Sequence, residues 1–124
     1  FLGGFTITAG LEAVIEYLKN FRFDESDLAY LSTLKSSDGS PLFSQEFFDF
    51  LLQLKFTCDI DAVPEGNVVF PYEPLIRVKG PLIQCQLLES PLLNLINFPT
   101  LIATKAARIC IAADEDPVFE FGLR

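Results

Sequence analysis

The hydrophobic period of this chain changes twice, and that change constrains the fold more than any other feature of the sequence. Apolar residues recur at helical spacing from residue 11 to 54, alternate with polar residues from 57 to 79, and become dense again from 81 to 113. Recurrence every three to four residues indicates amphipathic helices, and recurrence every two residues indicates strands with one wet face. We therefore predict an α+β fold, with N-terminal helices, a small antiparallel sheet, and then long helices.

Capping and turn residues predict where the elements of the first two regions begin. Thr8 and Ser44 each precede a helical apolar pattern, and their side chains are suited to cap the free N–H groups of a first turn. Asp24 starts the helix between them, where early acidic residues are favourable at the positive end of the helix. Turns that contain proline or glycine separate the alternating segments. We expect an antiparallel meander of three strands at residues 57–62, 68–70 and 76–79.

The segment from residue 81 to 113 is apolar but contains two prolines. Proline costs about 3 kcal/mol inside a helix, so we expect a break at Pro91 and a new helix after Pro99, over residues 100–113. This second helix is apolar nearly all round, which predicts burial on most of its sides. Polar residues and prolines interrupt the segment, and they argue against a membrane span.

The composition excludes several classes of function. The net charge of −8 argues against a nucleic-acid partner and against an anionic membrane surface. The chain has no histidine, the commonest general base and metal ligand, and we predict no metal site. Cys58, Cys85 and Cys110 are far apart among apolar residues, so we expect buried, reduced thiols in a cytoplasmic protein.

Two basic residues in the last predicted helix form a possible anion site. Lys105 and Arg108 lie about one turn apart and share a face. That face either binds an anion or is a solvated stripe balanced by Asp114 and Glu115, and charge patterning favours the stripe.

An aromatic ring and a guanidinium lie three positions apart in the last residues, after a predicted strand at 118–121. Residues i and i+3 of a strand face opposite sides, so Phe121 and Arg124 reach one ligand only if the strand ends or bends near Gly122. There, phenylalanine would stack on a planar ring and arginine would pair with a carboxylate or phosphate. Spacing alone favours a core phenylalanine followed by a solvated arginine.

Several segments, in order along essentially the whole chain, resemble the nicotinate phosphoribosyltransferases. They are residues 3–6 (GGFT), 8–12 (TAGLE), 21–23 (FRF), 62–66 (AVPEG), 80–83 (GPLI), 86–89 (QLLE), 93–98 (LNLINF), 102–108 (IATKAAR) and 120–124 (EFGLR).

The resemblance implies the N-terminal portion of a two-domain enzyme, an α+β domain followed by an α/β barrel. Residues 1–113 would be the N-terminal domain with its connecting helices, and residues 114–124 would begin the barrel with its first strand. The chain has no initiator methionine and ends in a strand-like segment, so we expect a piece of a larger protein that is inactive alone.

The implied reaction joins nicotinate to the ribose of phosphoribosyl pyrophosphate, yielding nicotinate mononucleotide and pyrophosphate for NAD biosynthesis. The family couples this to ATP hydrolysis with Mg²⁺ through a phosphorylated histidine, as a homodimer with shared active sites. Similarity to the related nicotinamide enzymes implies that Phe121 stacks on the pyridine ring and Arg124 binds the substrate carboxylate or phosphate. The resemblance therefore favours a binding role for both residues, whereas spacing alone favours a core phenylalanine and a solvated arginine. No catalytic residue is expected in this piece.

Some features depart from the family, and alternatives stay open. The phosphorylated histidine is absent, and Ser90 stands where quinolinate enzymes have an arginine, which disfavours a substrate with two carboxylates. A related enzyme acting on nicotinamide or quinolinate is one alternative, and a non-catalytic structural or dimerisation domain is another. The meander also resembles half of a biotinyl-type carrier, but its turns at residues 64–67 and 71–74 lack the lysine that a carrier needs.

Overall fold

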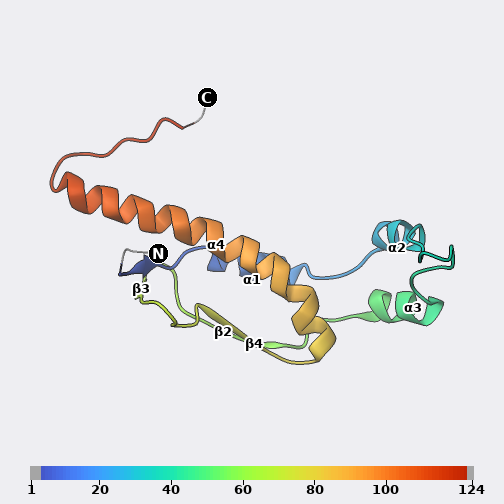
Figure 1. Cartoon of the computed structure of the whole chain (residues 1–124). Coiled ribbons are helices and arrows are strands. Elements are labelled where there is room, and N and C mark those ends of the chain that lie inside the picture. Colours follow the sequence, from blue (N-terminus) through green and yellow to red (C-terminus); the bar gives the residue numbers. More distant parts are fainter. Residues whose placement is uncertain (1–3, 123–124) are drawn as a thin grey trace. The chain divides into compact units, whose positions relative to one another are not determined.

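A computed structural model describes residues 4–122 of the chain, and it confirms the predicted α+β class (Figure 1). The elements are β1 (Thr6–Ile7), α1 (Leu11–Lys19), α2 (Glu25–Ser32), α3 (Gln45–Gln53), β2 (Asp59–Ala62), β3 (Val68–Val69), β4 (Ile76–Lys79) and α4 (Leu82–Ala113). Contacts divide the chain into two compact units. The first unit is Phe1–Ile15 with Cys58–Arg124, and the second is Glu16–Thr57.

The second unit confirms the predicted Ser44 cap and the predicted helix start at Asp24, and it shows that Asp24 is itself a cap. The Asp24 carboxylate accepts hydrogen bonds from the backbone N–H groups of Ser26 and Asp27, while the Asp27 carboxylate accepts one from the N–H of Asp24. The Ser26 hydroxyl and then these N–H groups lower the pKa of Asp24. Ser44 likewise accepts from the N–H of Phe47 at the start of α3. Both caps act within one turn, so neighbouring residues suffice to predict them.

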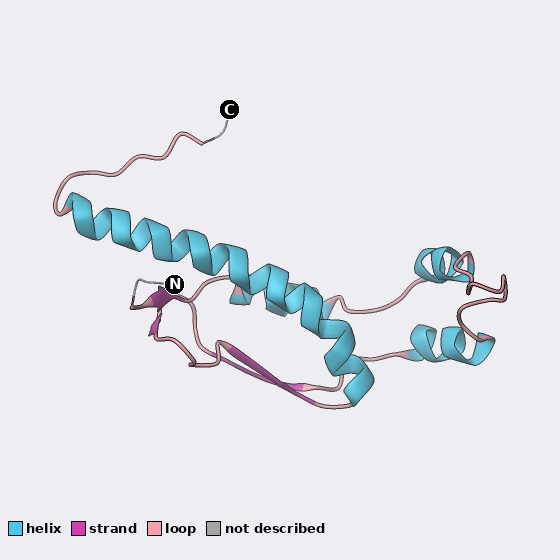
Figure 2. Cartoon of the chain, in the orientation of Figure 1, coloured by secondary structure: helices cyan, strands magenta, loops and turns pink. Residues whose placement is uncertain are grey.

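The strands pair differently from the predicted meander. β2 and β4 form one antiparallel pair with Asp59 opposite Lys79, whereas β3 pairs with β1, with Thr6 opposite Val69 (Figure 2). Residues 6–7 had no predicted strand, and the three-stranded meander is wrong because β3 leaves it. The alternating pattern identified the strands, but not which strand lies beside which.

Thr8 holds this second pairing together and does not cap α1. Its hydroxyl donates to the Pro64 carbonyl oxygen at 2.6 Å and accepts from the N–H of Asn67 at 3.1 Å. The N–H of Thr8 donates to the Asn67 carbonyl oxygen at 3.0 Å. Thr8 is 4% exposed, so these bonds satisfy a buried polar side chain. The predicted N-cap role of Thr8 is therefore wrong.

The prolines do not break α4, which runs without interruption past both Pro91 and Pro99. Proline lacks an N–H, so Pro99 leaves the carbonyl of Leu95 without its usual helical donor. The backbone of Gly10 lies directly against that carbonyl, so closely that a Cβ on Gly10 would overlap its oxygen. The predicted breaks at the two prolines are therefore wrong. At Pro99 the Leu95 carbonyl loses its helical hydrogen bond, and the backbone of Gly10 packs against this carbonyl.

One face of α4 is buried, not most of its sides. Its buried residues recur every fourth position, which places them along one ridge of the helix. They are Gln84, Leu88, Leu92, Ile96, Thr100 and Thr104. Large apolar side chains elsewhere on the helix, including Phe98, Leu101, Ile102 and Ile111, are exposed. The predicted burial on most sides is therefore wrong.

Among the described residues, α4 is long and apolar enough to cross a membrane by length and composition alone. The polar residues and prolines that argue against a span do not bring α4 below these two criteria. Core helices of soluble proteins meet the same two criteria.

Two further expectations concern the end of the chain and the thiols. No strand forms in the described part of residues 117–124, so the strand predicted at 118–121 is wrong in this structure. A strand needs a partner for its backbone groups, and this segment has none among the described strands. Cys58 is buried as predicted, but Cys85 is half-buried and Cys110 is exposed.

Candidate functional site

The C-terminal half of α4 binds the segment that begins at β1. Two threonines one turn apart on α4 supply the contacts. The N–H of Ile7 donates to the Thr104 hydroxyl oxygen at 2.9 Å, and the Thr100 hydroxyl donates to the Ala9 carbonyl oxygen at 3.0 Å. The apolar ridge of α4 thus becomes polar where the backbone of residues 7–9 needs partners.

Arg108 extends this row by one more turn and carries the only cation–π contact among the described residues. Its Nη2 donates to the Phe5 carbonyl oxygen at 2.9 Å, and its guanidinium carbon lies 5.1 Å from the centre of the Phe5 ring. A guanidinium over an aromatic face is attracted by the ring quadrupole. Arg108 is therefore already engaged in holding Phe5.

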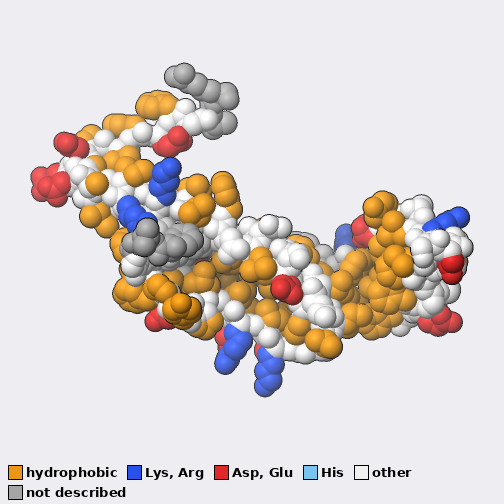
Figure 3. Space-filling model, in the orientation of Figure 1, with side chains coloured by type: hydrophobic (Ala, Val, Ile, Leu, Met, Phe, Trp, Pro, Cys, Tyr) orange, Lys and Arg blue, Asp and Glu red, His pale blue; other side chains and the backbone are white. Residues whose placement is uncertain are grey.

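Lys105 and Arg108 do share a face, as their spacing predicts. They line a shallow hollow of about 370 Å³ together with Leu101, Thr104, Ile109 and Ala112. Figure 3 shows basic side chains over the C-terminal half of α4, where Lys105 and Arg108 are the basic residues. Among the described residues, neither Lys105 nor Arg108 forms an ion pair with Asp114 or Glu115, so the predicted balance does not take that form.

The contacts of Arg108 predict a larger structural role for it than for Lys105. We expect Arg108→Lys to lower the free energy of unfolding by about 1 kcal/mol, because lysine keeps the charge but loses the planar stack and its fixed hydrogen bond. The matched variant Lys105→Ala removes an exposed side chain and should change it by less than about 0.5 kcal/mol. Urea unfolding measures both. Equal effects of the two variants would contradict the role given to Arg108.

Phe121 is not brought together with the basic pair by any described contact. Phe121 is 81% exposed in a segment without regular structure. Arg124 lies outside the described residues, so its predicted role stays a prediction. The exposed ring of Phe121 is free of the core, which disagrees with the core phenylalanine that spacing alone favoured.

Sequence reasoning missed the role of Glu65, which caps α1 from a distant part of the chain. Its Oε1 accepts from the N–H of Gly10 at 2.6 Å and from the N–H of Glu12 at 3.3 Å. A carboxylate is favourable there because the N-terminal end of a helix carries a partial positive charge. The only signal was the turn chemistry of residues 64–67, which does not indicate a contact 55 positions away.

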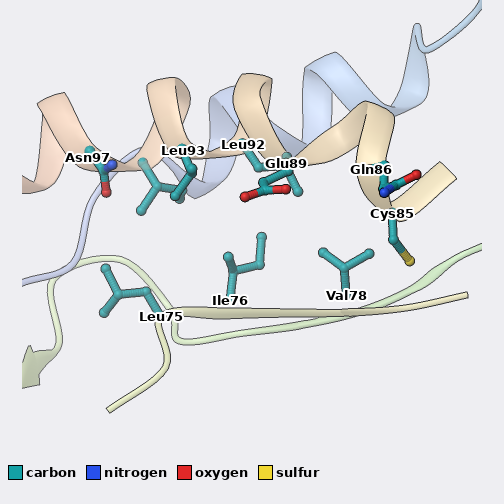
Figure 4. A pocket seen from close by; sticks show the side chains of 10 residues that line it. Leu75, Ile76, Val78, Cys85, Gln86, Glu89, Leu92, Leu93 and Asn97 are labelled. Atoms are coloured by element: carbon teal, nitrogen blue, oxygen red, sulfur yellow. The ribbon is translucent and has the colours of Figure 1, made fainter. Parts of the chain in front are cut away.

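A groove of about 450 Å³ lies between α4 and β4 and was also missed (Figure 4). Leu75, Ile76 and Val78 form one wall, and the facing residues of α4 include Glu89 and Asn97. Glu89 and Asn94 of α4 are both exposed, so neither polar side chain needs a partner inside the protein. The groove combines segments that the sequence separates, so periodicity within either segment could not reveal it.

The described residues offer no ready metal site. Among them, no three His, Cys, Asp or Glu side chains cluster closely enough to hold an ion. The residues present therefore do not fit a Mg²⁺ ligand set, and the chain has no histidine to phosphorylate.

Comparisons with known proteins agree along the whole chain. Residues 1–97 match the family model of the nicotinate phosphoribosyltransferase N-terminal domain. A nicotinate phosphoribosyltransferase of Mycobacterium tuberculosis is 44% identical over 120 residues, which covers 97% of this chain and 25% of the relative. The enzyme of that name from Bacillus subtilis is 44% identical over 124 residues, which covers 100% of this chain and 24% of the relative.

A solved structure gives the same result for the fold. The crystal structure of human nicotinic acid phosphoribosyltransferase matches with a TM-score of 0.82 at 38% identity, covering 98% of this chain and 24% of that one. The chain thus spans about a quarter of the length of the relatives that it matches.

Proposed function

This chain belongs to the nicotinate phosphoribosyltransferase family, and from that premise we propose that it serves as the N-terminal part of an enzyme that makes nicotinate mononucleotide. A bond forms between the pyridine nitrogen of nicotinate and the anomeric carbon of phosphoribosyl pyrophosphate, and the bond to pyrophosphate breaks. The observation that carries the proposal is similarity over the whole chain in both sequence and fold. The product feeds NAD biosynthesis.

Positioning and electrostatics are what this chain would contribute to the reaction. Departure of pyrophosphate leaves positive charge on the ribose, so catalysis depends on holding the two substrates together and on stabilising the leaving group. Phe121 would stack on the pyridine ring, and its exposure supports this role. Arg124 would bind the nicotinate carboxylate or a substrate phosphate. Residues 114–124 would begin the barrel domain after an N-terminal domain of residues 1–113.

Of the two basic residues on α4, Lys105 is the better candidate to meet an anion. Its ammonium group is exposed at the hollow, whereas the guanidinium of Arg108 is engaged by Phe5. We therefore assign Lys105 the anion-binding role that the shared face suggested for both residues. Arg108 would support that role by fixing the adjacent backbone.

Mg²⁺ and ATP are further parts of this proposal. When bound, Mg²⁺ would offset the negative charge of pyrophosphate, and ATP hydrolysis would drive the transfer. The described residues do not cluster to hold the ion, so its ligands would come from elsewhere in the enzyme, and no step through it is assigned to this chain.

We also propose a cytoplasmic homodimer with shared active sites. Exposed apolar side chains on α4, such as Phe98 and Ile111, support an association surface. Sedimentation of the active enzyme tests this, and a monomer at assay concentration would exclude it. Association without turnover of any pyridine substrate would favour the alternative, a non-catalytic dimerisation domain.

Turnover of nicotinate tests the proposed function directly. We expect the enzyme that contains this chain to convert nicotinate and phosphoribosyl pyrophosphate to the mononucleotide with Mg²⁺, faster when ATP is added. Nicotinamide and quinolinate should react poorly. Product formation is followed by chromatography. A preference for nicotinamide or quinolinate would instead assign the chain to the enzyme that uses that substrate.

The variant Arg124→Gln tests the site. Loss of a charged hydrogen bond to the substrate should lower kcat/KM for nicotinate on the order of 100-fold. The matched control is Arg77→Gln, because Arg77 pairs with Asp61 at an exposed position and should leave kcat/KM unchanged. Equal activity of the two variants would remove Arg124 from substrate binding.

A further inference from the structure

Two of the three cysteines lie against the same glycine. Cys58 precedes β2 and Gly80 follows β4, so the two residues extend the register of that strand pair. A Cβ on Gly80 would lie only 2.5 Å from the Cys58 sulfur, so the missing side chain leaves the space that the sulfur occupies. The Cys85 thiol donates to the Gly80 carbonyl oxygen at 3.6 Å. Both thiols therefore converge on Gly80.

The first turn of α4 brings the second thiol to this point. The N–H of Cys85 donates to the Pro81 carbonyl oxygen, which winds the chain back over Gly80. The side chain of Cys85 points from α4 toward the sheet (Figure 4). Burial raises the pKa of the Cys58 thiol, and the Cys85 thiol raises this pKa further. Both thiols thus lie against Gly80, where β4 ends and α4 is about to begin.

We propose that Cys58 and Cys85 are a redox modification site, at which a small disulfide oxidant such as oxidised glutathione joins them in an intrachain disulfide. Cys85 reacts first, because it is half-buried whereas Cys58 is buried. The inference does not depend on the proposed enzymatic function.

The chemistry balances with glutathione disulfide as the only oxidant. The Cys85 thiolate attacks one glutathione sulfur, a mixed disulfide forms, and one glutathione leaves as a thiolate that takes up a proton. The Cys58 thiolate then attacks the Cys85 sulfur, the protein disulfide forms, and the second glutathione leaves in the same way. Two protein thiols are oxidised, and one glutathione disulfide is reduced to two thiols.

The third cysteine is a built-in control. Cys110 is exposed on the same helix, 25 residues beyond Cys85 and so about 37 Å away along its axis. A disulfide between sulfurs requires Cα atoms within about 7 Å, so Cys110 cannot pair with Cys85. It should instead accept glutathione as a mixed disulfide.

The test is to oxidise the full reduced chain with oxidised glutathione, block the remaining thiols, digest, and map the peptides by mass spectrometry. We expect a peptide pair joined through Cys58 and Cys85, with Cys110 glutathionylated or blocked. The linkage should raise Tm by about 10 °C, because it closes a loop of about 27 residues.

Two variants sharpen the result. Cys110→Ser should retain both the linked peptide and the rise in Tm, whereas Cys85→Ser should lose both. The map of the unaltered chain decides the question even if a cysteine variant folds poorly. Glutathione on all three cysteines without the linked peptide, or linkage only between chains, would overturn the proposal.

Discussion

Replacing Gly10 by alanine is expected to lower the free energy of unfolding by about 4 kcal/mol. The backbone of Gly10 has a φ of +98°, where side chains other than glycine's hydrogen are strained. An added Cβ would also overlap the carbonyl oxygen of Leu95, so the segment before α1 and helix α4 would have to separate. Both obstacles consist of backbone atoms, which cannot rotate away as a side chain does.

Gly66→Ala is the matched control for the Gly10 prediction. Gly66 lies in the same unit with a similar φ of +80°, but nothing lies within 4 Å of an added Cβ. It should therefore cost only about 1–2 kcal/mol, the strain of the left-handed backbone. Urea unfolding followed by circular dichroism measures both variants. If the two alanine variants lose the same free energy of unfolding, the close packing of Gly10 on Leu95 contributes nothing to stability.

Leu88→Ala is the second change with a large expected effect. Leu88 is 0% exposed and lies on the buried ridge of α4. Truncation removes buried methyl groups and leaves a cavity, which should lower the free energy of unfolding by about 3 kcal/mol. The shift in urea midpoint, with the slope unchanged, measures this loss.

Leu101→Ala provides the comparison on the same helix. Leu101 is 47% exposed, so the same chemical change should cost less than about 1 kcal/mol. Similar losses at positions 88 and 101 would mean that the ridge is not the packed face of α4. That result would also contradict the finding that apolar side chains of α4 outside the ridge are exposed and not packed.

Local signals predicted the helices of the second unit well. Asp24 and Ser44 cap their helices through bonds to residues two or three positions away. The same reasoning failed at Thr8, whose hydroxyl bonds to the distant turn at residues 64–67 and not to the first turn of α1. Glu65 then took the capping position. Competition between near and distant partners is decided by the folded structure.

The candidate site was predictable only in part. Spacing placed Lys105 and Arg108 on one face, and they line one hollow. It could not reveal that Phe5 engages Arg108, because the two residues are 103 positions apart. The roles of Phe121 and Arg124 stay predictions, and they came from resemblance to a family and not from spacing.

By itself, the sequence determined the α+β class, the Ser44 cap, the helix start at Asp24 and the shared face of the basic pair, because each depends on residues within about one turn or one strand. Only the tertiary structure decided that β3 pairs with β1, and that α4 continues past Pro91 and Pro99 with a single buried ridge. Strand partners, and groups such as Gly10 that lie beside a carbonyl freed by proline, come from distant positions. Their contribution arises only when the chain has folded, so no local pattern records it.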